Sequence, residues 1–170
     1  YLAKMRNATI RFRTDEPDYS ALPEQCYDWT NSVYGKVEEL LPTNAPEPLG
    51  KFVVITHYVD ANLYHCMLTG RSVTGILTLL NKTPIDWYSK KQSTVETATY
   101  GSEFVAARTC TEQNINLRNT LRYLGVNIRV KSYMFGDNES VVNSSTLPHA
   151  KLHKRHTALS FHHVHEVIAS

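Results

Sequence analysis

The sequence predicts an α/β fold: an antiparallel meander of three strands, a fourth strand parallel to the first, and helices packed on this mixed sheet. Two observations support this fold class. Strand-forming runs with short connections fill residues 51–91, and a helical pattern separates them from another strand-forming run at 127–137. A crossover of this length returns the chain parallel to an earlier strand. The 170 residues suffice for one domain with a core, with or without an appendage.

The first strand is predicted at KFVVITHYVDA, residues 51–61, a β-branched and aromatic run with Asp60 at its end. The segment GRSVTGILTLLNKTPIDWYSKK, residues 70–91, reads as two further strands with a turn near Asn81 and Lys82. Short connections of this kind favour antiparallel neighbours.

A helix is predicted next, because Ser93 and Glu96 have the spacing of a capping box. Its inward stripe consists of Thr99, Glu103, Ala106, Cys110, Leu117, Leu121 and Leu124, and Gly125 ends the pattern. Small residues in the stripe allow close packing on a sheet. Glu103 is the one charge in it, and a buried carboxylate requires a partner.

The two ends of the chain differ from this middle part. Residues 1–50 hold five of the seven prolines and most of an acidic stretch, and they predict a short helical or extended start followed by a loop-rich tether. Residues 154–170 predict an amphipathic helix with apolar positions Leu159, Phe161, Val164 and Ile168. Tyr27, Trp29 and Tyr34 in the tether are expected to be packing residues.

The composition of the chain bears on its cellular compartment and on the kind of partner it binds. No apolar run approaches the roughly 20 residues of a membrane span. The three cysteines form neither a disulfide framework nor a CxxC pattern, which favours a reducing, intracellular setting. The net charge is only +2, but basic residues gather at 89–92, 118–131 and 151–156. Such clusters suit a polyanion bound on one face, and ordinary solvated surface explains them as well.

Three carboxylates are predicted to converge. If the fourth strand lies beside the first, Asp60 and Asp137 meet at one edge of the sheet, and the crossover helix lays Glu103 over them. Carboxylates this close repel unless cations neutralise them, and Mg²⁺ is the usual ion near phosphates. The alternative for each acid is a turn, a helix cap or partial exposure.

The chain resembles the ribonuclease H domain of copia-type retrotransposon polyproteins over residues 52–168. The resemblance lies in YVDAN, GRSVTG, IDWYSKKQSTVETATYGSEFVA, LRNTLRYLGV, YMFGDNESVV and KRHTALSFHHVHE. It implies a ribonuclease H-like fold for 51–170, with Asp60, Glu103 and Asp137 as catalytic ligands of two Mg²⁺ or Mn²⁺ ions. Residues 1–50 would be the trailing edge of the reverse transcriptase and its linker.

The same resemblance implies the substrate and the setting. The substrate would be the RNA strand of an RNA–DNA hybrid, cut during reverse transcription in a cytoplasmic virus-like particle or in the nucleus. Ala158 and His165 depart from the family pattern. The family's final strand and fourth carboxylate lie beyond Ser170, so a C-terminally truncated domain is expected. The alternative is an inactive retrotransposon-derived fragment that keeps the fold or binds nucleic acid without turnover.

Contacts to nucleic acid are predicted from basic and polar side chains near the start of the crossover helix and beside Asp137. These are Arg71, Ser89, Lys90, Lys91, Gln92 and Asn138. Lys90 and Lys91 are alternatively the protection of an edge strand, and Asn138 a helix cap. The histidines near Glu166 invite a zinc interpretation, but His163 and His165 point apart on a helix, so half-buried, partly charged imidazoles at the surface of the helix are expected.

Overall fold

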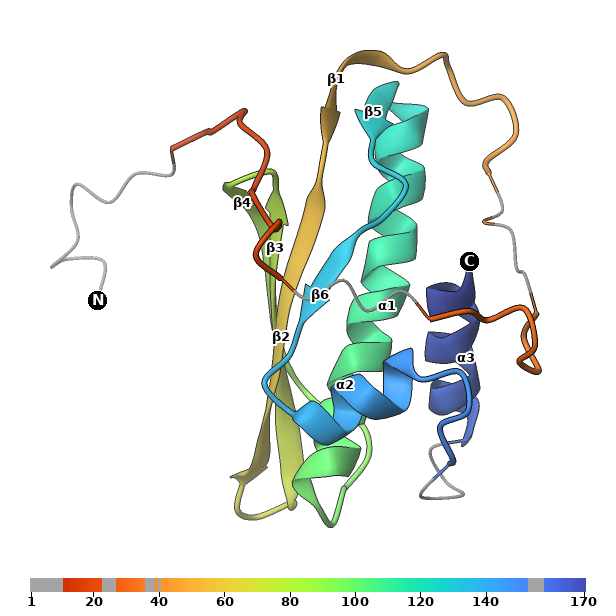
Figure 1. Cartoon of the computed structure of the whole chain (residues 1–170). Helices are drawn as coiled ribbons and strands as arrows, with labels where there is room; N and C mark the ends of the chain where they lie inside the picture. The colour runs from red at the N-terminus through yellow and green to blue at the C-terminus, as the bar shows by residue number, and fades with distance from the viewer. Residues whose placement is uncertain (1–10, 23–26, 36–38, 40, 153–157) are drawn as a thin grey trace, which may run out of the picture.

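A computed structural model describes residues 11–22, 27–35, 39, 41–152 and 158–170. Four strands form a mixed sheet in the order β4-β3-β2-β6 (Figure 1). The meander consists of β2 (Ile55–Cys66), β3 (Arg71–Leu80) and β4 (Thr83–Lys91), and β6 (Tyr133–Phe135) lies parallel to β2. The predicted fold class is confirmed.

Two of the predicted strands are each divided in two. β1 (Leu49–Val53) and β5 (Val126–Ile128) pair in a separate two-stranded parallel sheet. Val54 separates β1 from β2 because its N–H donates to Asn81 Oδ1 at 2.9 Å, and its carbonyl accepts from Asn81 N–H at 2.7 Å. These bonds occupy backbone groups that a continuous ladder would use, so the prediction of a single strand at 51–61 is wrong. The prediction of a single strand at 127–137 is also wrong, because residues 129–132 belong to neither β5 nor β6.

The crossover helix α1 (Thr99–Tyr123) begins later than the capping box predicted. Its N-cap is Ala98, which makes no side-chain cap. Glu96 is instead buried at 2% exposure and packs against the first helical turn, where a Cβ on Gly101 would lie 2.2 Å from its Oε2. Gly125, at φ +70°, follows the helix as predicted, since this conformation suits glycine.

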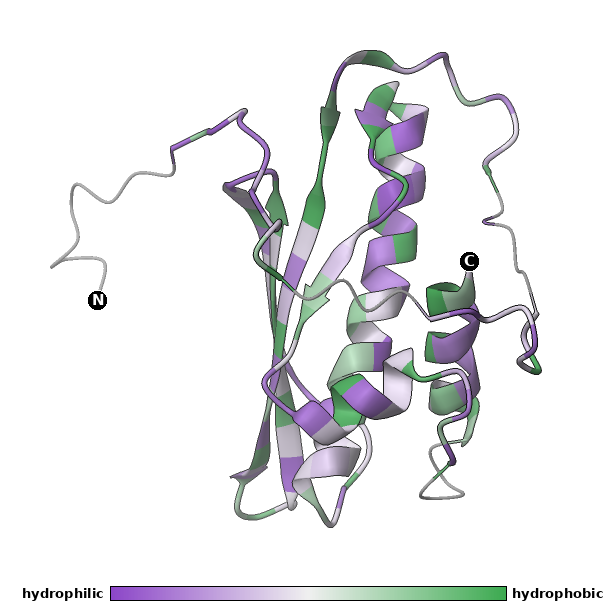
Figure 2. Ribbon diagram, in the orientation of Figure 1, coloured by the Kyte–Doolittle hydropathy of each residue, from purple (hydrophilic) through white to green (hydrophobic). Residues whose placement is uncertain are grey.

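The core lies between the sheet and α1. Val59, Ala61 and Ile76 of the sheet meet Ala106 and Cys110 of the helix, as the stripe of small residues predicted. Farther along, the buried ring of His57 contacts Thr78 Oγ1 at 3.0 Å and Asn114 Oδ1 at 3.1 Å, linking β2 to β3 and α1. Figure 2 shows hydrophilic residues alternating with hydrophobic ones along α1, as expected of a helix with one buried side.

A second helical layer covers α1 on the side away from the sheet (Figure 1). It contains α2 (Glu139–Thr146) and α3 (Ala158–Ala169). Phe161 and Val164 of α3 are buried with Phe104 and Ala107 of α1, as predicted. Leu159 and Ile168, however, are 84% and 39% exposed, so the predicted apolar face of α3 is wrong at these two positions. The part of this predicted helix at 153–157 lies outside the described residues.

His165 corrects another expectation, because it is fully buried rather than on the surface. Its Nε2–H donates to the carbonyl of Ser144, which joins α3 to α2. The rings of Phe161 and Trp29 lie 4.1 and 5.2 Å from it between centroids. The imidazole of His165 therefore packs against aromatic rings on the inner side of α3, where we expected contact with water.

The described residues before Leu49 form no helix or strand, in line with a loop-rich tether, yet they pack on the domain. Trp29 is buried at 9% exposure, and Tyr34 Oη contacts His162 Nδ1 at 2.6 Å. Glu39 pairs with Arg118 and Arg122 of α1. None of the helices in the described ranges combines the length and hydrophobicity that a bilayer crossing requires.

Candidate metal centre

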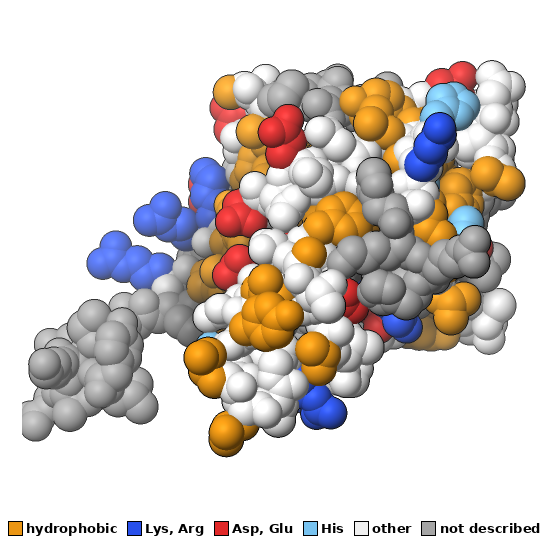
Figure 3. Space-filling model, turned by 90° about the horizontal axis from the view of Figure 1, so that it is seen from below, with side chains coloured by type: hydrophobic (Ala, Val, Ile, Leu, Met, Phe, Trp, Pro, Cys, Tyr) orange, Lys and Arg blue, Asp and Glu red, His pale blue; other side chains and the backbone are white. Residues whose placement is uncertain are grey.

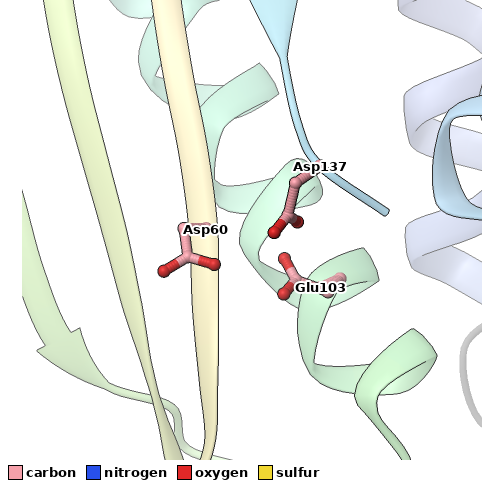
Figure 4. Close-up of side chains that lie close together, drawn as sticks. All are labelled: Asp60, Glu103 and Asp137. Carbon is pink, nitrogen blue, oxygen red and sulfur yellow. The ribbon is translucent and has the colours of Figure 1, made fainter. Parts of the chain in front are cut away.

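Three carboxylates from separate parts of the chain meet beside the middle of β2, where β6 ends. Asp60, Glu103 and Asp137 each offer an oxygen, and these oxygens all lie within 4.8 Å of one another. Figure 4 shows Asp60 on β2, Glu103 on α1 and Asp137 on the segment after β6. Asp60 and Asp137 are exposed, whereas Glu103 is only 7% exposed. The convergence that the sequence predicted is present.

The route by which Asp60 reaches this cluster differs from the prediction. Asp60 lies inside β2, opposite Gly75, and does not end the strand. The neighbouring strand β6 ends at Phe135, which pairs with Tyr58, two residues before Asp60. The edge of β2 beyond Tyr58 is therefore accessible to side chains from α1.

Asp137 is held by the structure on both sides of it. Gly136, just before it, lies beside Val59 of β2, where a Cβ would be in ordinary van der Waals contact at 3.5 Å from Val59 Cγ1. Asn138, just after it, is the N-cap of α2, and its Oδ1 accepts from Val141 N–H at 3.1 Å. The cap that the sequence analysis offered as an alternative for Asn138 is thus its observed role in the fold.

Glu103 is a buried acid beside two other acids. Burial raises its pKa to about 7, and the negative charges of Asp60 and Asp137 add to this, while a hydrogen bond from the Ala61 N–H opposes it. The proximity of the three carboxylates is unfavourable without a positive charge among them. Oxygen ligands of this kind fit a hard divalent cation such as Mg²⁺ or Mn²⁺.

Several predicted nucleic-acid contacts lie near this cluster. Asp60, Gly75 and Ser89 stand opposite one another across three strands, so Ser89 shares a face of the sheet with Asp60. Lys91 is two residues along β4 and lies on the same face, and Arg71 is exposed at the start of β3. Lys90 points to the other face, where its Nζ lies 5.5 Å from the centroid of the Tyr88 ring.

Gln92 is inside the protein, where we expected a surface residue. It is 5% exposed, and its Nε2 donates to Thr74 Oγ1 at 3.0 Å and to the Ser102 carbonyl at 2.8 Å. These bonds join the end of β4 to the first turn of α1. Gln92 thereby helps to place the helix that carries Glu103.

Histidine does not form a comparable group. Among the described residues, the acidic cluster is the one set of three or more side chains with metal-ligand geometry. His162 is engaged with Tyr34, and His165 is buried against aromatic rings. The zinc interpretation gains no support from this part of the chain.

Charge is unevenly distributed around this end of the molecule. Figure 3, viewed from below, shows several Lys and Arg side chains together at the left edge and others scattered among the acidic and hydrophobic side chains of this face. Two backbone features of the site were not predicted from the sequence: the Ala61 N–H, which lowers the pKa of Glu103, and Gly75, which stands opposite Asp60 on β3. A glycine inside a strand was the available signal for the second.

The fold and the cluster define an α/β domain of the ribonuclease H-like class with an acidic centre. No protein-family model matches the chain, and no curated protein matches it. Among solved structures it is similar to LC11-RNase H1, isolated from compost by a metagenomic approach, with a TM-score of 0.51 and 16% sequence identity. The similarity covers 67% of this chain and 74% of that one, and at this identity it establishes the fold.

Proposed function

We propose that the protein is a metal-dependent endonuclease that hydrolyses the RNA strand of RNA–DNA hybrids. The observation that carries the proposal is the convergence of Asp60, Glu103 and Asp137 within 4.8 Å on a ribonuclease H-like fold. The motifs shared with copia-type polyproteins support the hybrid as substrate and reverse transcription of a retrotransposon as its setting.

The three carboxylates have distinct tasks in this proposal. Two Mg²⁺ or Mn²⁺ ions, when bound, supply an activated water and positive charge at the leaving oxygen of a phosphodiester. Asp60 and Asp137 are exposed and face the substrate side, so they are the ligands that a phosphate approaches. Glu103 is buried on α1, so it anchors the centre in the domain.

Substrate orientation is assigned to the sheet surface beside Asp60. Ser89 and Lys91 share its face and Arg71 is exposed at the adjoining end of β3, so all three suit contacts with the sugar–phosphate backbone. Such contacts hold a duplex in place without reading its sequence. Lys90, on the other face of β4, contributes a longer-range positive potential.

The division of the chain belongs to the same proposal. Residues 51–170 form the ribonuclease H-like domain, and residues 1–50 form a linker with the trailing edge of a reverse transcriptase region. The lack of regular structure in the described residues before Leu49 supports a linker.

The test is cleavage of a hybrid with a labelled RNA strand in the presence of Mg²⁺ or Mn²⁺. We expect cleavage of the RNA in the hybrid, no cleavage of RNA or DNA duplexes, and a loss of at least about 100-fold in Asp60→Asn. Asp86→Asn is the matched control, because Asp86 is exposed on β4 outside the cluster. Hybrid binding without product would contradict the proposal and favour the fragment that binds without turnover.

A further inference from the structure

We propose that Tyr19, which precedes the ribonuclease H-like region, is a positioning residue for Asp137 at the metal centre. The inference rests on the proposed function in that it takes the acidic cluster as a metal site. Its basis is that Tyr19 contacts both β2, which carries Asp60, and β6, which comes just before Asp137.

β6 is short for an element that delivers a metal ligand. It has three residues, and it pairs with β2 only from Thr56 to Tyr58. Asp137 follows two residues after its end. Because so short a ladder is weak by itself, the place of Asp137 depends on what else holds β6 against β2.

Tyr19 provides such a contact. Its ring lies 4.7 Å from that of Tyr133 and 5.3 Å from that of Phe135, between centroids. Its hydroxyl is hydrogen-bonded to Thr56 Oγ1 at 2.9 Å, and Thr56 is fully buried. Thr56 and Tyr133 are direct partners across the two strands. One side chain therefore spans the pairing between β2 and β6.

The contact lies on the face of the sheet that α1 does not cover. His57 points to α1, where it contacts Asn114, so the neighbouring Thr56 points the other way. Tyr58, next on that face, stacks on Phe135 at 5.4 Å. Tyr19 thus completes an aromatic layer over β6 with Tyr133, Phe135 and Tyr58.

The chain around Tyr19 is itself fixed on the sheet. We call residues 13–19 the strap. Arg13 N–H donates to Thr83 Oγ1 at 2.7 Å, and Asn81 Nδ2 donates to the Thr14 carbonyl at 3.0 Å. Asp15 pairs with Lys82. The strap is anchored at the turn between β3 and β4 and crosses to β6, so the position of Tyr19 follows from several bonds.

A later part of the N-terminal region supports β6 from its other end. Glu39 pairs with Arg118, and the same guanidinium donates to Ser132 Oγ at 2.9 Å, one residue before β6. Two separate contacts of the N-terminal region therefore flank β6. Displacement of the strap would free the strand that precedes Asp137 and leave Asp60 and Glu103 on longer elements.

The test measures Mn²⁺ binding to the full chain by calorimetry or electron paramagnetic resonance at pH 8. We expect Tyr19→Ala to weaken Mn²⁺ binding about tenfold, the low end of the effect of removing groups that orient metal ligands. Tyr19→Phe keeps the ring contacts, so we expect a loss of less than about threefold. Hydrogen exchange should quicken at Tyr133–Phe135 in Tyr19→Ala and remain slow at Ala106 and Cys110.

Two controls separate positioning from general stability. Val164→Ala removes core volume between α1 and α3, so it should lower the melting temperature and leave Mn²⁺ affinity unchanged. Glu103→Gln should abolish Mn²⁺ binding and show that the cluster is the site measured. If Tyr19→Ala does not fold, Tyr19→Leu takes its place, with an expected loss of at least about threefold because the stacked rings and the hydroxyl are gone.

The outcomes distinguish the two proposals. Wild-type Mn²⁺ affinity and wild-type exchange of β6 in the Tyr19 variant would overturn the positioning role, and so would absence of Mn²⁺ binding to the wild-type chain. Weakened Mn²⁺ binding in a chain whose wild type binds Mn²⁺ but leaves hybrid uncut would support the positioning role and overturn the proposed nuclease.

Discussion

At the scale of single residues, the carboxyl group of Glu103 determines how the acidic cluster responds to pH. Its pKa is raised from 4.5 to about 7, first by burial and then by Asp60 and Asp137. Between these two values the folded chain binds a proton that the unfolded chain has released. The free energy of unfolding therefore falls as the pH rises through this range.

We predict this loss for the metal-free protein between pH 4.5 and about 7, and its recovery on addition of Mg²⁺ at pH 8. Urea unfolding at several pH values, with EDTA and with Mg²⁺, measures it. In EDTA, Glu103→Gln should reduce the dependence of the free energy of unfolding on pH over this range. It should also abolish the increase in the free energy of unfolding on addition of Mg²⁺. An equal pH profile in Glu103→Gln and wild type would contradict the assignment.

Single residues also show what the sequence allowed us to predict about the site. Asp60, Glu103 and Asp137 were predictable because a carboxylate on a buried stripe or at the end of a strand-forming run stands out within a short window. Tyr19 was not predictable, because its partners Thr56 and Tyr133 are distant in sequence. The residues next to Tyr19 in the sequence are mostly polar and give no sign of a packing role. Gln92 carried no signal that separates a buried hydrogen-bonding residue from a surface one.

At the scale of elements, Glu39 holds the C-terminal half of α1. It accepts hydrogen bonds from Arg118 at 2.7 and 2.8 Å and from Arg122 at 2.7 and 2.5 Å. Partial burial opposes ionisation, but the two guanidinium groups outweigh it and lower the pKa of Glu39 to about 2. The bonds thus stabilise the fold above the ordinary pKa of 4.5 and are lost as the pH falls toward 2.

We predict that Glu39→Gln lowers the free energy of unfolding by about 1–2 kcal/mol at pH 7, a value reduced for the partial exposure of the group. The difference from wild type should shrink as the pH falls from 4.5 toward 2. Chemical unfolding at pH 7 and pH 3 measures both. Glu112→Gln, which affects an exposed pair with Arg108, is the control and should change little.

The type of each helix and strand could be predicted from the sequence, but its first and last residues could not. The β-branched runs and the stripe of small residues gave the meander, the crossover and its packing. The break at Val54 was hidden because it depends on Asn81, which is far along the chain. The late start of α1 was hidden as well, because Glu96 is buried against the first helical turn and the N-cap falls at Ala98.

At the scale of the whole molecule, the distribution of charge determines how strongly nucleic-acid binding should depend on salt concentration. The net charge is only +2, so binding depends on local cations. We predict that Lys90→Ala with Lys91→Ala lowers the salt dependence of hybrid binding by about one unit of log–log slope, because Lys91 faces the substrate side and Lys90 lies on the other face of β4. Titrations of binding at several salt concentrations measure this slope.

Lys82→Ala is the matched control for that experiment. Lys82 is neutralised by Asp15 at the far end of β4, so its loss should change the slope by well under about one unit. An unchanged slope in the Lys90 and Lys91 double variant would place the phosphate contacts elsewhere on the surface.

Glu103 and Arg118 lie on the same helix, α1, so the distance between them is fixed. The rise of an α-helix separates them by about 22 Å. Glu103 belongs to the metal centre at one end of this interval, and Arg118 holds Glu39 at the other. The distance between the metal centre and the Glu39 contact of the N-terminal region is therefore set by the helix itself, and one inserted helical turn would lengthen it by about 5.4 Å.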